Sequence, residues 1–290
     1  MKHYIIKTRK QLSSIEVKQC HYLSDICQKV DATHRQPYLS NMLNFNKEMP
    51  AFILAYQDEQ LVGLLCIYSD DKNDPAEVSI IVTPDERRKG IATALLEYFY
   101  AIQAEYQLLG PLFVTEQIFL DKNPRFLANM QLVEEVEYET WLFREPHYFD
   151  ITDLPNVNVA QASSQQIEVI ARFQSHAFKT SLETSRQYAQ EAIYDEHSLL
   201  YVMEKDGEVI ASCTVDLSTK YNYLYSLAVS EPFRGKGLGS TLVKYIINDL
   251  SVKNQKSFQI AVEKTNTRAL RLYKNLGFVE QTKIVYLRKE

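Results

Sequence analysis

The chain of 290 residues is long enough for two domains of ordinary size, and 46% apolar with 24% charged residues describes a folded globular protein. A formal net charge of −5 argues against a general nucleic-acid-binding protein, and four scattered cysteines without a C-x-x-C pair argue against a zinc site. No apolar run approaches the roughly 20 residues of a membrane span, and residues 1–7 lack the core of a signal peptide. We therefore expect a cytoplasmic protein with no metal, no nucleic-acid partner and no membrane contact, whose oligomeric state is left open.

The first half of the chain predicts a strand, a helix and then a sheet with further helices. Ser13 or Ser14 is expected to cap the first helix, and residues 31–50 are polar and irregular. The predicted order is a strand at 4–8, a helix to about 30, a hairpin of strands at 52–56 and 61–68, a strand at 76–82, a helix to about 105, a strand at 112–115, a weak helix at 123–129 and a strand at 137–143.

The second half repeats this order. Ser163 is expected to cap a helix, and Asp206-Gly207 is a strong turn signal between two strands. The predicted order is a strand at 157–161, helices after 163 and at 183–194, strands at 199–204, 208–216 and 223–229, a helix at 242–250, a strand at 258–262, a helix at 266–276 and a strand at 278–288.

A shift of 147 residues lays one half on the other. It pairs Arg87 with Arg234 and Gly90 with Gly237, and between positions 82 and 98 it gives six identities in seventeen positions. Because this repeat includes the most distinctive motif of the chain, we predict two tandem copies of one fold. The predicted domains are residues 1–146 and 157–290, joined by a linker at 147–156.

The most distinctive motif is Arg234-Gly235-Lys236-Gly237-Leu238-Gly239-Ser240, between a predicted strand and a predicted helix. Glycines allow close backbone approach to a ligand, and a helix start offers unpaired N–H groups to an anion. The Walker A spacing and the G-x-G-x-x-G dinucleotide spacing are both absent. The motif predicts a phosphate site, to which Arg234 and Lys236 add positive charge; the alternative is a structural turn.

Arg-x-x-Gly-x-Gly between a strand and a helix resembles the pyrophosphate-binding loop of the GNAT superfamily of acyl-CoA-dependent N-acyltransferases. Residues 262–278 resemble the second signature of that family: Asn266 opens a helix, Tyr273 lies on it, and Gly277-Phe278 follows. The resemblance covers 157–288 clearly and 1–145 more weakly. It implies an α/β fold of two tandem GNAT-like domains, each a twisted mixed β-sheet flanked by helices.

The resemblance also implies acetyl-CoA as co-substrate, with its pantetheine arm between two diverging strands. Asn266 would hydrogen-bond that arm, although a helix cap is an alternative role for it. The implied cofactor-binding residues are Leu227, Val229, Arg234, Gly235, Lys236, Gly237, Leu238, Gly239, Ser240 and Asn266.

Tyr273 is the predicted catalytic residue. Aminolysis of a thioester expels a thiolate, and a phenol with a pKa of about 10 stays protonated near neutral pH and can supply the proton. The alternative is an aromatic ring packed on the inner face of its helix with Leu270 and Leu276.

The residue that removes a proton from the acceptor amine is left open. Many relatives carry a carboxylate on the strand before the loop, where this chain has Tyr223 and Tyr225. The alternatives are a water relay to a tyrosine, to Glu263 or to Asp216, or direct action by His176. A backbone N–H at Leu227 is the candidate for stabilising the oxyanion.

The first copy departs from the family pattern. Asn123 matches Asn266, but Met130 then falls where Tyr273 stands, and methionine cannot donate a proton. Arg88 also replaces a glycine of the loop. We expect this copy to be catalytically degenerate, with its affinity for CoA left open.

The sequence thus predicts an N-acetyltransferase that moves acetyl from acetyl-CoA to a primary amine of a small molecule or peptide by direct attack. One alternative is a non-catalytic, acyl-CoA-binding regulatory protein, and another is an O- or S-acyltransferase or one using a longer acyl group. The nature of the acceptor carries no readable signal.

Overall fold

The computed structural model describes residues 4–152 and 154–290, which fall into two compact units. Residues up to Glu139 together with Thr282–Glu290 form the first unit, and Thr140–Gln281 form the second. This division differs from the predicted one, which assigned the whole end of the chain to the second copy. The last strand joins the first unit because residues 284–287 pair with residues 113–116 and because Val285 and Leu287 are buried there.

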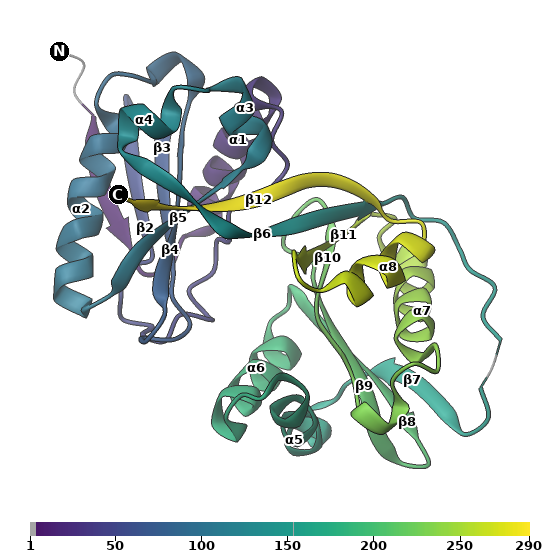
Figure 1. Cartoon of the computed structure of the whole chain (residues 1–290). Helices are drawn as coiled ribbons and strands as arrows, with labels where there is room; N and C mark the ends of the chain where they lie inside the picture. Colours follow the sequence, from purple (N-terminus) through teal and green to yellow (C-terminus); the bar gives the residue numbers. More distant parts are fainter. Residues whose placement is uncertain (1–3, 153) are drawn as a thin grey trace. The chain divides into compact units, whose positions relative to one another are not determined.

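The first unit contains a mixed sheet with helices on both faces (Figure 1). Its elements are β1 (Ile5–Arg9), α1 (Ser14–Asp31), β2 (Phe52–Gln57), β3 (Gln60–Tyr68), β4 (Pro75–Val82), α2 (Ile91–Tyr106), β5 (Leu109–Glu116), α3 (Gln117–Lys122), α4 (Phe126–Met130), most of β6 (Leu132–Arg144) and most of β12 (Val279–Lys289). The strand order in this unit is β1-β2-β3-β4-β5-β12-β6, and β4 and β5 run parallel.

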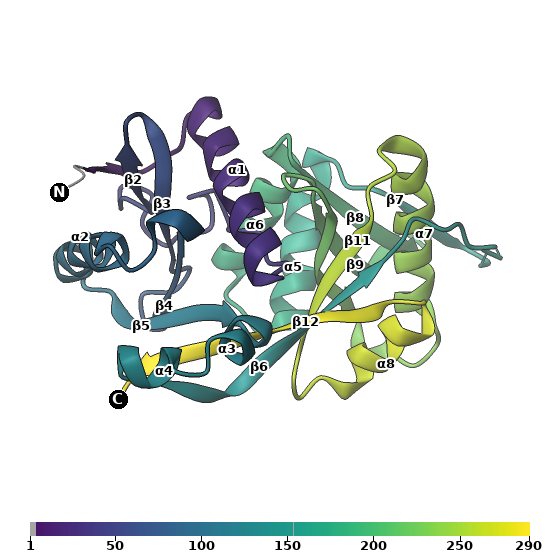
Figure 2. The ribbon, with the colours of Figure 1, turned by 90° about the horizontal axis from the view of Figure 1, so that it is seen from above.

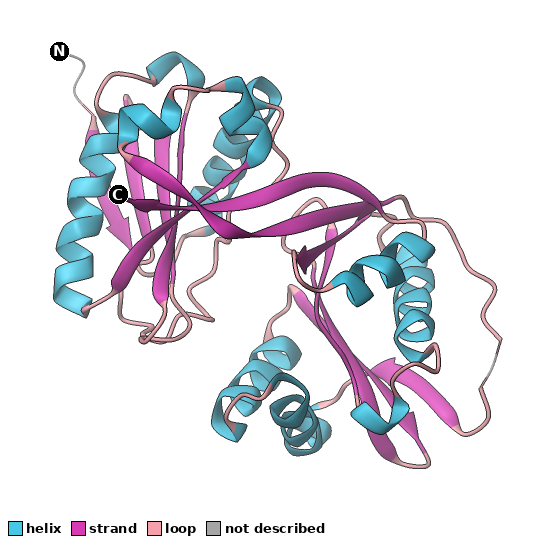
Figure 3. Ribbon diagram, viewed as in Figure 1, coloured by secondary structure: helices cyan, strands magenta, loops and turns pink. Residues whose placement is uncertain are grey.

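In the first unit, strands β2 and β3 lie between α1 and α2 (Figure 2). A hydrophobic cluster packs on each face of these strands. Ile53 points toward the cluster beneath α2, whereas its neighbour Leu54 points toward the cluster beneath α1. This alternation follows the period of two of a strand, and it buries both faces of β2 and β3. Helix α1 begins with a capping box in which Ser13 and Glu16 bond each other's main-chain N–H groups. The loop from α1 to β2 contains neither helix nor strand (Figure 3).

The second unit repeats this plan. Its elements are β7 (Val157–Gln161), α5 (Ile167–Phe178), α6 (Leu182–Tyr194), β8 (Ser198–Lys205), β9 (Glu208–Asp216), β10 (Asn222–Val229), α7 (Leu238–Lys253), β11 (Phe258–Glu263) and α8 (Thr267–Asn275). The strand order is β11-β10-β9-β8-β7, and β10 and β11 run parallel. Helix α7 covers one face of the sheet, and α5 and α6 cover the other.

The predicted succession of elements is confirmed in both halves. Helix α3 was not predicted, and the weak helix predicted at 123–129 is the shorter α4. Asp206 and Gly207 both have positive φ, as expected for the tight β8–β9 turn. The four cysteines are buried free thiols.

Candidate functional site

The loop between β10 and α7 forms a cradle of main-chain N–H groups. Gly235 and Gly237 both have φ of +79°, the left-handed region that glycine adopts without penalty. Thr241 is the first residue after the loop whose N–H bonds a main-chain carbonyl, that of Gly237. In the described part of the chain, the N–H groups of residues 235–240 bond no acceptor. Six free donors in sequence at a helix start are an arrangement that can bind an anion.

The charged side chains of this loop bind its own carbonyl groups. Arg234 Nε donates to the carbonyl of Val229 at 2.9 Å, and Lys236 Nζ donates to the carbonyl of Pro232 at 3.0 Å. The Lys236 ammonium also lies 5.4 Å from the centre of the Phe233 ring. These contacts fix the turn before α7 and leave the main-chain N–H groups as the donors open to an anion.

Strand β10 separates from β11 beside this cradle. The parallel pairing of the two strands covers only Asn222–Leu224 and Phe258–Ile260. A bulge follows between Tyr225 and Ala228, where Ser226 has a φ of +51°. Leu227 and Val229 therefore lie beyond the last pair with β11, on a strand edge that an extended ligand can join.

Asn266 and Tyr273 lie on α8. Asn266 Oδ1 accepts the N–H of Ala269 at 3.1 Å, so the helix-cap role is present. The Tyr273 side chain is only 4% exposed, and its ring packs edge-on against Phe278 at 5.8 Å between centroids. Burial raises the pKa of the Tyr273 phenol, and nearby Cys213 and Tyr223 add to the shift. Its hydroxyl makes no hydrogen bond to another described residue.

Aromatic side chains occupy the part of β10 where many relatives carry a carboxylate. The rings of Tyr223 and Tyr225 stack at 6.1 Å, and Trp141 stacks on Tyr223 at 5.2 Å. Among the carboxylates considered from the sequence, Glu263 is exposed, and Asp216 accepts the N–H of Ser218 at 2.7 Å. His176 is exposed near the end of α5.

The first unit has the same cradle. The N–H groups of residues 88–93 bond no acceptor in the described part of the chain, and the helix bonds begin with Ala94 to Gly90. Arg87 Nε donates to the carbonyl of Val82 at 3.0 Å, as Arg234 does to Val229. Arg88 has a φ of +62° and Gly90 a φ of +88°, so the backbone of this loop keeps the shape of the glycine-rich one.

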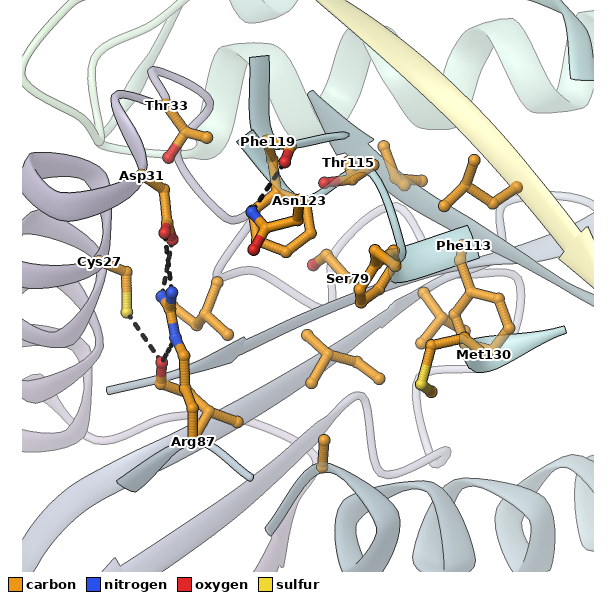
Figure 4. Close-up of a pocket in the computed structure, with 18 of the residues that line it drawn as sticks. Cys27, Asp31, Thr33, Ser79, Arg87, Phe113, Thr115, Phe119, Asn123 and Met130 are labelled. Carbon is orange, nitrogen blue, oxygen red and sulfur yellow. Dashed lines mark hydrogen bonds and ion pairs between the residues drawn. The ribbon is translucent and has the colours of Figure 1, made fainter. Parts of the chain in front are cut away.

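A cavity of about 780 Å³ adjoins this cradle in the first unit (Figure 4). The pairing of β4 with β5 ends at Val78–Phe113, and residues 78–82 and 113–116 line the cavity where the strands separate. The sequence had pointed to the second copy for the binding site. The cavity was not predicted because α1 and the loop after it form part of its wall, and no short sequence motif indicates how these segments pack.

Side chains from several elements meet in the cavity of the first unit. Arg87 binds both oxygens of Asp31, at 2.7 and 2.6 Å, which raises the pKa of the guanidinium. Asn123 Nδ2 donates to the carbonyl of Phe119 at 2.8 Å, and Met130 lines the cavity at the end of α4 (Figure 4). The sequence had singled out Asn123 and Met130 by register.

Two copies of a diverging parallel strand pair, each beside a loop of free N–H groups, define a tandem acyl-CoA-type transferase fold. The model of the acetyltransferase (GNAT) family matches residues 17–112 and 167–278. The chain belongs to this family and is an acetyltransferase, as the sequence predicted.

The chain is similar to proteins of known activity and known structure. It is 25% identical over 243 residues to a mycothiol acetyltransferase of Corynebacterium glutamicum, which covers 81% of this chain and 80% of that protein. It is 27% identical over 87 residues to the ribosomal protein bS18 alanine N-acetyltransferase of Escherichia coli, which covers 30% of this chain and 59% of that protein.

Solved structures share the whole fold. A GCN5-related N-acetyltransferase from Sphaerobacter thermophilus matches with a TM-score of 0.71 and 16% identity, over 99% of this chain and 95% of that one. A tandem GNAT protein from the clavulanic acid biosynthesis pathway matches with a TM-score of 0.70 and 15% identity, over 98% of each chain. These matches support the prediction of two tandem domains of one fold.

Two further observations concern the described part of the chain. In the described residues, no helix has both the length and the apolar character needed to cross a bilayer. Within the same residues, no group of three or more His, Cys, Asp or Glu side chains is arranged to hold a metal ion.

Proposed function

We propose that this protein transfers acetyl from acetyl-CoA to a primary amine of a small molecule or peptide, and that the second unit is catalytic. The observation that carries the proposal is the Tyr273 hydroxyl, which bonds no described residue in a unit that also holds a cradle of six free N–H groups. The family supplies the general reaction; the acceptor and the choice of unit are the proposed part.

Each part of the second unit has a role in this proposal. The N–H groups of residues 235–240 bind the diphosphate, with Arg234 and Lys236 holding the loop in shape. The main-chain groups of Leu227 and Val229 hydrogen-bond the pantetheine arm, as they would hydrogen-bond an added strand. Asn266 caps α8 and directs its amide group toward the same arm.

The reaction is a direct attack. The amine nitrogen forms a bond to the thioester carbonyl carbon, and the carbon–sulfur bond then breaks. Tyr273 donates its proton to the departing sulfur. Burial raises the pKa of the phenol, which keeps it protonated at neutral pH and also makes it a weaker acid. An N–H group of β10 near Leu227 donates a hydrogen bond to the carbonyl oxygen and so stabilises the negative charge that develops on it. Glu263, Asp216, His176 and a tyrosine acting through water remain the candidates for taking up the proton of the amine.

The test is thiol release from acetyl-CoA in the presence of a panel of primary amines. We expect Tyr273→Phe to lower kcat by about a hundredfold or more, the typical contribution of general acid catalysis. The matched control is Tyr194→Phe, which removes the same hydroxyl from an exposed position on α6. Unchanged turnover in Tyr273→Phe would contradict the assignment.

The second candidate function is acyl-CoA binding without turnover. It is favoured by the first unit, which combines a cradle and a cavity with Met130 in place of a phenol. Binding of CoA, measured by calorimetry, without thiol release for any amine would support this function over the first.

A further inference from the structure

Two oppositely charged side chains, Arg35 and Glu77, line a small recess of the first unit, and of the two only Arg35 also lines the cavity. Arg35, from the loop after α1, lines both the cavity and a small recess that adjoins it. Glu77, near the start of β4, lines the recess, and Cys66, Ser79 and Val114 line both spaces. The closest nitrogen–oxygen distance between Arg35 and Glu77 is 3.9 Å.

This pair is not closed by hydrogen bonds. The guanidinium of Arg35 and the carboxylate of Glu77 have no hydrogen-bond partner among the described residues. Other ion pairs of the same unit close fully, since Arg87–Asp31 measures 2.6 Å and Arg9–Glu16 measures 2.8 Å. The Arg35 and Glu77 side chains are only 20% and 30% exposed, so their charges lose hydration without gaining a direct bond.

The backbone holds Arg35 in this position. Its N–H donates to Glu116 Oε1 at 2.7 Å, and its carbonyl accepts Gln28 Nε2 at 2.8 Å. The N–H of His34 also donates to Glu116, whose carboxylate is 3% exposed. Helix α1 and strand β5 therefore fix the main chain of Arg35 beside the cavity before any ligand arrives, which lowers the entropic cost of binding.

The two open charges select a ligand that carries both complementary charges close together. A guanidinium presents paired N–H donors that match a carboxylate, and a carboxylate accepts the N–H bonds of an ammonium group. A zwitterionic α-amino acid has these two groups on one carbon atom. We propose that the first unit binds a free α-amino acid, with its carboxylate on Arg35 and its ammonium group on Glu77.

The surroundings of the pair fit this ligand. Burial raises the pKa of Glu77, whereas Arg35 opposes the shift and the nearby carboxylates of Glu139 and Asp70 add to it. An ammonium group bonded to Glu77 reduces the repulsion that Glu77 meets from them. The cavity leaves room for the side chain of the amino acid. The inference concerns binding in the first unit, and it holds whichever unit performs acetyl transfer.

Ligand-observed NMR on the full chain tests the proposal. Free amino acids are compared at millimolar concentration with the amide and the N-acetyl derivative of the same residue, each of which lacks one charge. We expect one or more free amino acids to bind and both derivatives to bind at least about tenfold more weakly. Arg35→Gln and Glu77→Gln should each weaken binding by about tenfold or more, and Arg35→Lys should restore part of the loss.

The matched controls are Arg288→Gln and Glu135→Gln, which remove the charges of another ion pair of the first unit, closed at 2.7 Å. Thermal unfolding verifies that each variant is folded. The proposal is overturned if no free amino acid binds or if the derivatives bind as well as the free form. It is also overturned if the control variants lose as much affinity for the amino acid as the Arg35 and Glu77 variants do. Thiol release by Tyr273→Phe is read separately, so failure here is distinguishable from failure of the proposed reaction.

Discussion

Arg88 adopts in the first unit the left-handed backbone conformation that Gly235 adopts in the second, with φ of +62° and +79°. A Cβ atom at Gly235 would meet nothing within 4 Å, so the loop has room for a side chain at this point. An arginine at the corresponding position, Arg88, therefore costs only the free energy of the left-handed backbone conformation, about 1–2 kcal/mol. Replacement of a glycine here is therefore no evidence that the first loop has lost its shape, contrary to the argument from sequence.

Gly235→Ala tests that cost directly. We expect a loss of about 1 kcal/mol in the unfolding free energy of the second unit, because the new methyl group enters open space and only the backbone is strained. Urea denaturation measures it. A loss several times larger would mean that the space at Gly235 is not open.

The pH dependence of thiol release follows from the raised pKa of Tyr273. An acid whose pKa is raised keeps its proton to higher pH, so the phenol remains a donor beyond its ordinary pKa of about 10. We expect kcat to rise with pH as the acceptor amine loses its proton, with no decline below pH about 10. A pH–rate profile for a simple amine measures this. A decline that begins near neutral pH would exclude Tyr273 as the donor.

Tyr201→Phe should destabilise the second unit. The buried Tyr201 hydroxyl donates to Asp249 at 2.5 Å and accepts Gln161 Nε2 at 3.2 Å, so its removal should cost about 1–2 kcal/mol in urea denaturation.

The same substitution has a signature at high pH. Burial raises the pKa of Tyr201, and Asp249 adds to the shift, so the folded state keeps a proton that the unfolded state loses near pH 10. Since the folded state then binds more protons, stability falls as pH rises above about 10. The unfolding free energy of the Tyr201→Phe variant should fall less steeply between pH about 8 and about 10.5 than that of the wild type. If the unfolding free energies of variant and wild type fell equally with pH, the Tyr201 hydroxyl would not be the group that keeps its proton in the folded state.

Asp31→Asn tests the ion pair in the cavity of the first unit. The amide retains at most part of the bidentate bonding to Arg87, and the side chains are 12% and 30% exposed, so we expect a loss of about 2 kcal/mol. The control is Glu48→Gln, which breaks the exposed pair with Lys10 in the same unit and should leave the urea midpoint unchanged. Equal effects of the two substitutions would contradict the structural importance of Asp31.

Local pattern was sufficient for much of the fold. Alternating and helical periodicities predicted the strands and helices in order. Ser13, one of two expected caps, and Ser163 begin helical segments as expected, and each forms a capping box. The glycine spacing around 234–240 predicted a strand–loop–helix, since these preferences act within a few residues. Helix α3 escaped prediction because its six residues carry too short a pattern to register.

The sequence by itself determined the repeat, the two loops before α2 and α7, and the family to which they belong, because those features depend on neighbouring residues and on the need of backbone N–H groups for partners. Only the tertiary structure decided that the final strand completes the first unit, that a cavity lies in the copy expected to be degenerate, and that Arg35 and Glu77 face each other there. These outcomes depend on contacts between residues far apart in the chain. Arg35 and Glu116, for example, are hydrogen-bonded although 81 residues separate them, and no local sequence pattern predicts that contact.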